Sequence, residues 1–122
     1  DNGWLETRTA ANGQIAAYTF NSLGQITALT NTRSGSTLSA FTGMTYDTPG
    51  NRVSVSASVP ALPALSGSTS YTYDGANQLT QELSGRAGGY TNNYTYDLAG
   101  NPTTFKGQTR TYNSENELTG GT

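Results

Sequence analysis

The 122-residue sequence contains no cysteine and no histidine. Without cysteine there are no disulfides and no thiol nucleophiles, and without either residue nearly all zinc and haem sites are excluded. Histidine is also the commonest general base in enzymes and the usual partner of a catalytic serine. We therefore predict that this chain is not an enzyme, and we expect it to need no cofactor and no metal.

Charged residues are equally scarce. They make up 11% of the sequence, the formal net charge is −2, and Lys106 is the only lysine. The arginines are scattered along the chain, so the sequence shows no basic stripe that would neutralise the phosphates of a nucleic acid or of an anionic membrane. No apolar run approaches the ~20 residues that a membrane-spanning helix needs. We expect neither a nucleic acid partner nor a membrane span in this segment.

Hydrophobic residues are also few, at 33% of the sequence. Disordered chains combine low hydrophobicity with high net charge, whereas the net charge here is small. Gly, Ser, Thr, Asn and Gln fill the missing share, and the abundant Thr and Tyr favour strands. No helical periodicity is present. This composition predicts ordered β-structure with many turns.

A short frame recurs five times: an aromatic residue, Asp or Asn, two variable residues, and then Gly or Asn. An aliphatic residue often follows two positions later. The first, second and fifth positions of the copies are Phe20, Asn21 and Gly24; Tyr46, Asp47 and Gly50; Tyr73, Asp74 and Asn77; Tyr96, Asp97 and Gly100; and Tyr112, Asn113 and Asn116. Gly3-Trp4-Leu5-Glu6 matches the end of the frame. Counted from Gly3, the fifth positions are 21, 26, 27, 23 and 16 residues apart, a spacing that suits one β-hairpin per period.

The residue types of the frame have a physical explanation. In Tyr-Thr-Tyr-Asp, at residues 71–74 and 94–97, the two tyrosines face one side of a strand and the threonine faces the other. Asp or Asn at the end of a strand accepts a bond from the backbone N–H two residues on, which forms an Asx turn. The fifth position reverses the chain with a positive φ, which Gly and Asn tolerate best. We predict antiparallel hairpins that turn at these fifth positions.

The phrases Tyr-Thr-Tyr-Asp-x-x-Gly-Asn and Tyr-Asp-x-x-Asn-x-Leu-Thr resemble the YD repeats of Rhs-type proteins. Such repeats occur in bacterial Rhs and wall-associated proteins, in insecticidal toxin complexes and in teneurins. The resemblance covers essentially the whole chain. It departs from the family pattern at Phe20, which replaces tyrosine, at Asn21 and Asn113, which replace aspartate, and at Pro102, which stands where leucine is usual. It implies one long sheet wound into a spiral or hollow shell. It also implies an extracellular or cell-surface protein whose partners are further YD repeats of the same or neighbouring chains.

The fold class that we predict is all-β, with tandem antiparallel hairpins in one continuous twisted or spiralling sheet, a partial shell or solenoid-like array. Residues 1–122 form a single repeat segment with an irregular linker at about 56–70, where Pro60 and Pro63 exclude a central strand. Val59, Leu62 and Leu65 make this linker apolar. It either packs over a nearby hydrophobic face or docks a partner. Residues 32–37 and 84–89 are expected to be hairpin loops.

Several residues allow a chemical reading beside a structural one. Asp47, Asp74 and Asp97 could act as acids or bind calcium, but Asn replaces Asp at two equivalent positions, which favours turn caps. Tyr73 and Tyr96 are expected to pack in the core, whereas Trp4 and Tyr90 are better placed to contact a glycan. Further readings concern two residues: Asn93 begins an N-glycosylation sequon, and Lys106 suits a solvated turn more than an isopeptide bond.

We expect the chain to be a structural segment of a secreted YD-repeat protein, acting as a shell or scaffold that encloses a cargo or toxin, or as a rigid rod. One alternative is an adhesin module that binds carbohydrate or protein. Another is the subunit of an extracellular filament whose copies pair through sheet edges. We also expect the half-hairpins at residues 1–8 and 117–122 to pair with strands from outside the chain or to fray.

Overall fold

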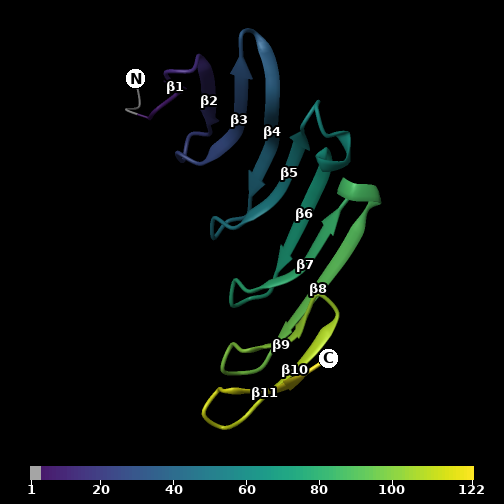
Figure 1. Ribbon diagram of the computed structural model, residues 1–122. Helices are drawn as coiled ribbons and strands as arrows, with labels where there is room; N and C mark the ends of the chain where they lie inside the picture. Colours follow the sequence, from purple (N-terminus) through teal and green to yellow (C-terminus); the bar gives the residue numbers. More distant parts are fainter. Residues whose placement is uncertain (1–3) are drawn as a thin grey trace.

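The structure, a computed structural model, describes residues 4–122. It is all-β and confirms the predicted fold class. Figure 1 shows the strands following one another in chain order, each antiparallel to the next, in one continuous open sheet. The eleven strands are β1 (Thr7–Thr9), β2 (Gln14–Phe20), β3 (Ile26–Arg33), β4 (Ser36–Tyr46), β5 (Arg52–Ser58), β6 (Gly67–Tyr73), β7 (Leu79–Ser84), β8 (Tyr90–Tyr96), β9 (Pro102–Phe105), β10 (Gln108–Tyr112) and β11 (Leu118–Gly121).

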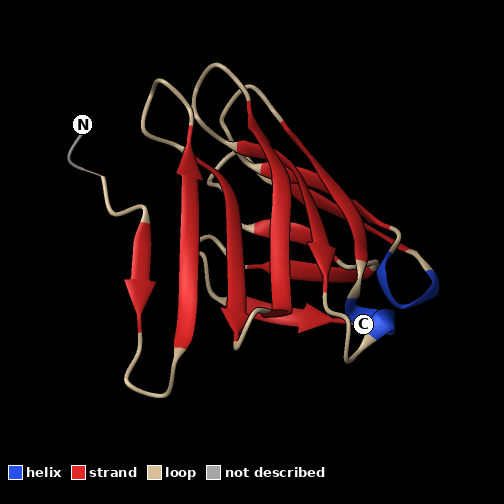
Figure 2. Ribbon diagram, turned by 90° about the horizontal axis from the view of Figure 1, so that it is seen from above, coloured by secondary structure: helices blue, strands red, loops and turns tan. Residues whose placement is uncertain are grey.

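The hairpins alternate between two kinds of connection. The five frame copies connect β2 to β3, β4 to β5, β6 to β7, β8 to β9 and β10 to β11. Their turns lie in a row at one end of the strands (Figure 1). The opposite ends of the strands are joined by tight turns and by two short 3-10 turns, Pro63–Leu65 and Arg86–Gly88. Seen from above, the strand direction turns steadily from one end of the sheet to the other (Figure 2), as the right-handed twist of strands requires.

The irregular linker is shorter than the sequence predicted. Strand β5 continues to Ser58 and β6 begins at Gly67, so only residues 59–66 leave the sheet. The prolines interrupt pairing only where they stand, and the serines before and after them form a normal ladder. Leu62 and Leu65 remain 57% and 41% exposed, so the linker does not pack its leucines over a hydrophobic face. The prediction of a partner-docking segment stays a prediction.

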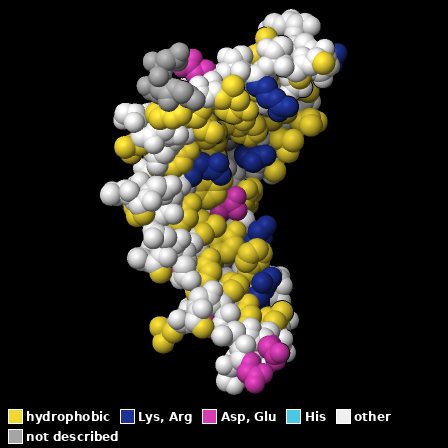
Figure 3. All heavy atoms as spheres, turned by 90° about the vertical axis from the view of Figure 1, so that its left-hand side faces the viewer, with side chains coloured by type: hydrophobic (Ala, Val, Ile, Leu, Met, Phe, Trp, Pro, Cys, Tyr) yellow, Lys and Arg dark blue, Asp and Glu magenta, His cyan; other side chains and the backbone are white. Residues whose placement is uncertain are grey.

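The sheet has two chemically different faces because side chains alternate along each strand. One row directly across five strands joins Tyr18, Leu29, Phe41, Ala57 and Gly67. We call the side that carries this row, with Tyr71, Tyr94 and Phe105, the aromatic face. Figure 3 shows hydrophobic side chains running nearly the length of the molecule.

Within residues 4–122 little of this apolar material is fully buried. Among hydrophobic residues only Ala57 and Tyr94 reach that level, and the larger side chains of the aromatic face are half-buried. A single-layer sheet encloses no core between two layers, which is how domains normally bury their apolar surface. The neighbouring hairpins therefore supply most of the packing that each hairpin receives.

Candidate functional site: the repeat turns and the aromatic face

The five frame turns share one backbone conformation. In each, the N–H of the second position bonds the carbonyl of the sixth, and the N–H of the fifth bonds the carbonyl of the second. The fifth residue has a positive φ in every copy: Gly24 (79°), Gly50 (100°), Asn77 (62°), Gly100 (87°) and Asn116 (62°). The chain reverses at each of these fifth positions, and their restriction to Gly and Asn follows from this φ.

The second-position Asp or Asn caps its turn. Its Oδ1 accepts a bond from the backbone N–H of the sixth position, at 2.7–3.0 Å in all five copies. In four copies it also accepts from the N–H two residues on. The turn at Asp47 has Pro49 there, which lacks an N–H, and the second bond comes from Gly50 instead. An amide oxygen performs this role as well as a carboxylate oxygen.

In four of the five copies the second and sixth side chains also bond each other. Asn51 and Asn101 donate from Nδ2 to Oδ2 of Asp47 and Asp97, both at 3.0 Å. Where the second residue is asparagine, the direction reverses, and it donates to the sixth side chain: Asn21 to Gln25 at 2.7 Å, and Asn113 to Glu117 at 2.8 Å. For Asp97, this bond and those from backbone N–H groups hold the carboxyl pKa below its ordinary value of 3.8.

The frame tyrosines tie each hairpin to the one before it. The hydroxyl of Tyr46 donates to the carbonyl of Ile26 at 2.7 Å, and Tyr73, Tyr96 and Tyr112 donate to the carbonyls of Arg52, Leu79 and Pro102 at 2.8, 2.9 and 3.2 Å. Each acceptor lies two residues after the fifth position of the preceding turn. Because the acceptor is a backbone carbonyl, Pro102 serves where leucine is usual, and its hairpin keeps the common geometry.

The other face of the sheet carries a row of hydroxyl pairs that the frame analysis missed. The residue before each frame aromatic bonds a hydroxyl on the returning strand: Thr19 with Thr27, Thr45 with Ser54, Thr72 with Thr80, Thr95 with Thr103, and Thr111 with Thr119, at 2.6–3.2 Å. The signal was present in the sequence, since threonine stands at both places in four of the five copies. Such cross-strand pairs support the ladder and make this face polar.

The cationic side chains gather on the aromatic face although they are scattered in the sequence. Arg52 lies over the ring of Tyr71 at 5.4 Å, and Arg110 and Lys106 lie over that of Phe105 at 4.6 and 5.8 Å. The remaining three are placed there by a shared cavity or by strand register: Arg8, Arg33 and Arg86. Figure 3 shows basic groups interleaved with hydrophobic ones. This face offers aromatic rings and cations together.

One acidic side chain lies among these groups. Glu82 accepts bonds from the hydroxyl of Tyr90 at 3.0 Å and from Nδ2 of Asn92 at 2.9 Å. Burial, and after it the Glu82 charge, raises the pKa of the neighbouring Tyr94. Burial likewise raises the pKa of Tyr73. These tyrosines stay protonated and serve in packing.

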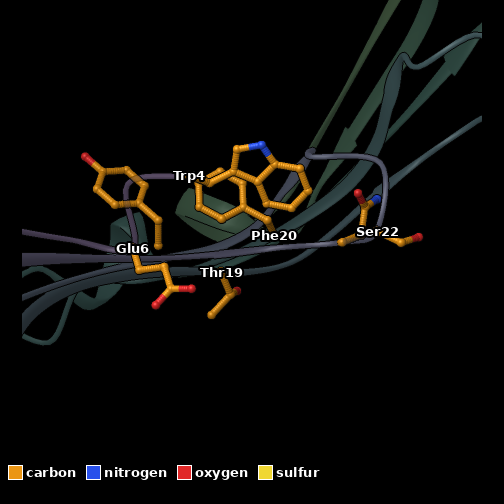
Figure 4. A pocket seen from close by; sticks show the side chains of 7 residues that line it. Trp4, Glu6, Thr19, Phe20 and Ser22 are labelled. Carbon is orange, nitrogen blue, oxygen red and sulfur yellow. The ribbon is translucent and has the colours of Figure 1, made fainter. Parts of the chain in front are cut away.

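Near the first hairpin, a depression of about 440 Å³ lies beside Trp4. The indole packs on Phe20, with ring centres 5.3 Å apart, while Glu6 and Thr19 point to the other side of the strand (Figure 4). Trp4 is only about a third exposed. Of the two residues proposed for glycan contact, Trp4 packs on Phe20 and Tyr90 bonds Glu82, and each keeps more than a third of its surface exposed.

The two remaining candidates have structural positions. Asn93 lies in β8, where its side chain accepts a bond from Gln81 at 3.1 Å. Lys106 and Gly107 form the tight turn between β9 and β10 with φ of 51° and 79°, so Lys106 is the turn lysine that the sequence predicted. Among residues 4–122 no three acidic side chains converge as metal ligands would, and no helix is of a length and hydropathy to cross a membrane.

Comparison with known proteins gives a clear result for the fold. No family model and no curated protein matches the sequence. Among solved structures, the crystal structure of TcdB2-TccC3-TEV matches with a TM-score of 0.74 and 22% identity, over 95% of this chain and 6% of that chain. The segment thus corresponds to a small part of a much longer chain. At the level of the fold, this likeness confirms the resemblance to Rhs-type YD-repeat proteins that the sequence indicated.

Proposed function

We propose that this chain is a non-enzymatic scaffold segment of a secreted YD-repeat protein, and that its aromatic face lines the inner side of a larger shell. The observation that carries the proposal is the half-buried aromatic face of a single-layer sheet. Exposed apolar patches of this extent in soluble proteins mark surfaces that meet something else. The opposite face, with its hydroxyl pairs, suits permanent contact with water.

The repeat architecture supports the same proposal. Each frame tyrosine bonds the preceding hairpin, and within residues 4–122 the main contacts of each hairpin are with its neighbours along the chain. Stability in such arrays is the sum of repeat and neighbour contributions, so they extend to any length. The fold likeness to TcdB2-TccC3-TEV, whose chain is far longer, is consistent with a segment of an extended wall.

Cysteine labelling on the two faces of β2 tests this role, since the chain has no cysteine of its own. Ala16 shares the aromatic face with Tyr18, and Ala17 is exposed on the hydroxyl face. Ala16→Cys and Ala17→Cys are matched small changes. In the 122-residue chain both should react with a maleimide. In the protein as the producing cell assembles it, we expect Ala17→Cys to react and Ala16→Cys to be protected at least about tenfold.

Other outcomes point elsewhere. Equal reactivity of both positions in the assembled protein contradicts the shell lining. Protection of Ala16→Cys only after addition of a carbohydrate supports the adhesin alternative. Reactivity of both, together with protection of the outer edges of β1 and β11, supports a filament joined through sheet edges.

A further inference from the structure

The row of frame turns at one end of the strands shows a second regularity, at the sixth position. The sixth residue of each turn lies over the fifth residue of the next turn along the sheet. There are five such contacts: Trp4 over Gly24, Gln25 over Gly50, Asn51 over Asn77, Gln78 over Gly100, and Asn101 over Asn116. Trp4 follows the same rule because it is the sixth residue of the half-frame at the start of the chain.

These contacts are of two kinds. Where the sixth residue of one turn has a long side chain, the fifth residue of the next turn is glycine. A Cβ on Gly24 would approach Cζ2 of Trp4 to 2.9 Å, and one on Gly100 would approach Nε2 of Gln78 to 3.3 Å, both too close for ordinary packing. On Gly50 the distance to Nε2 of Gln25 would be 3.6 Å, an ordinary van der Waals contact, so the amide of Gln25 lies directly against this glycine.

Where the sixth residue of one turn is the shorter asparagine, the fifth residue of the next turn is asparagine too. The two side chains then bond directly: Asn51 Nδ2 donates to Asn77 Oδ1 at 2.9 Å, and Asn101 Nδ2 to Asn116 Oδ1 at 2.8 Å. Both kinds of contact fill the same space. A long side chain over a bare backbone is one solution, and two short amides that meet halfway are the other.

We infer that the row of frame turns is a recognition surface, on which the sixth residue of one turn selects the fifth residue of its neighbour. From Gln25 onward the two kinds alternate along the chain. A hairpin that skipped one neighbour would place Gln25 over Asn77, where the side chains collide, or Asn51 over Gly100, where a gap remains. Similar hairpins in a repeat array can pair in the wrong order. The alternation favours pairing in sequence order.

The inference is tested by exchanging one kind of contact for the other in the full chain. Gly100→Asn should lower the melting temperature, because the new side chain meets Gln78. The control is Gly107→Asn: Gly107 also has a positive φ, but a Cβ there meets nothing within 4 Å. We expect Gly100→Asn to melt about 4 °C or more below Gly107→Asn, a shift typical of a lost or strained contact in a domain of this size.

The compensating change decides between recognition and plain crowding. Adding Gln78→Asn to Gly100→Asn recreates the two-asparagine contact and should recover most of the lost melting temperature, although Gln78→Asn alone lowers it. The reciprocal pair, Asn51→Gln with Asn77→Gly, should likewise melt above either single variant. If the two substitutions in each pair act additively, or if Gly107→Asn costs as much as Gly100→Asn, the inference is wrong. A single variant that does not fold leaves both double variants to decide.

Discussion

At the scale of the residue, the frame is explained by a few atoms. The second residue must offer one acceptor oxygen to the backbone N–H of the sixth, which Asp and Asn both do. The fifth residue must adopt a positive φ, which Gly and Asn do at least cost. The second and sixth side chains then adjust to each other, Asp with Asn and Asn with an acceptor.

This adjustment separates two aspartates that look equivalent in the sequence. Asp74→Asn should be nearly neutral, because Asp74 Oδ1 accepts only backbone N–H groups and its Oδ2 receives no bond from another described residue. Asp97→Asn should destabilise the fold, because the new amide faces Nδ2 of Asn101. Alanine at Asp74 should cost about 1 kcal/mol through loss of the cap, and alanine at Asp97 should destabilise the fold for the same reason. Urea unfolding measures all four free energies, and equal values for the two asparagine variants would contradict this account.

Acid provides an independent check on Asp97. Its pKa is lowered in the folded chain, chiefly by the side-chain bond from Asn101, so the folded state binds fewer protons than the unfolded state just below pH 3.8. The stabilisation is therefore present above that pH and is lost as pH falls through the folded pKa. The stability difference between the native chain and Asp97→Asn should shrink between about pH 6 and about pH 2. A difference independent of pH would show that the carboxylate charge contributes nothing.

At the scale of the element, hairpins are joined by backbone pairing and by the frame tyrosines. The turns were predictable from the sequence because their determinants lie within six residues. The tyrosine hydroxyl bonds were not, because their acceptors lie 17–21 residues upstream for Tyr46, Tyr73 and Tyr96. The side of the sheet on which each arginine lies was equally hidden. Register shifts, such as the one between Thr42 and Thr45, change which residues face which side.

Removing one hydroxyl measures its contribution. Tyr96→Phe keeps the ring and loses the bond to the Leu79 carbonyl, and we expect it to lower the free energy of unfolding by about 1 kcal/mol. Tyr71→Phe is the matched control on the same face, since the Tyr71 hydroxyl bonds no other described residue, and it should be nearly neutral. Thermal or urea melts of both variants suffice. A control as destabilised as Tyr96→Phe would remove the tyrosine link from the account.

At the scale of the whole molecule, the residues described form an open sheet with one polar and one aromatic face. The sequence predicted the continuous sheet, because one frame recurs at hairpin spacing. It did not predict the gathering of cations beside the rings, which depends on register along eleven strands. Strands β1 and β11 each pair on one side within the described chain, with β2 and β10. Pairing of their outer edges with strands from outside stays a prediction.

The central claim is that one frame holds every hairpin in the same way, and amide hydrogen exchange read by NMR tests it most directly. In all five turns the N–H groups of the second and sixth positions are bonded, whereas that of the third position bonds no described residue. In every turn we expect slow exchange at the second position, fast exchange at the third and slow exchange at the sixth. The third-position amides should exchange at least about tenfold faster than the bonded amides of the same turn. These third-position residues are Ser22, Thr48, Gly75, Leu98 and Ser114. Uniformly fast exchange across the turns, or a pattern confined to one or two of them, would contradict the account.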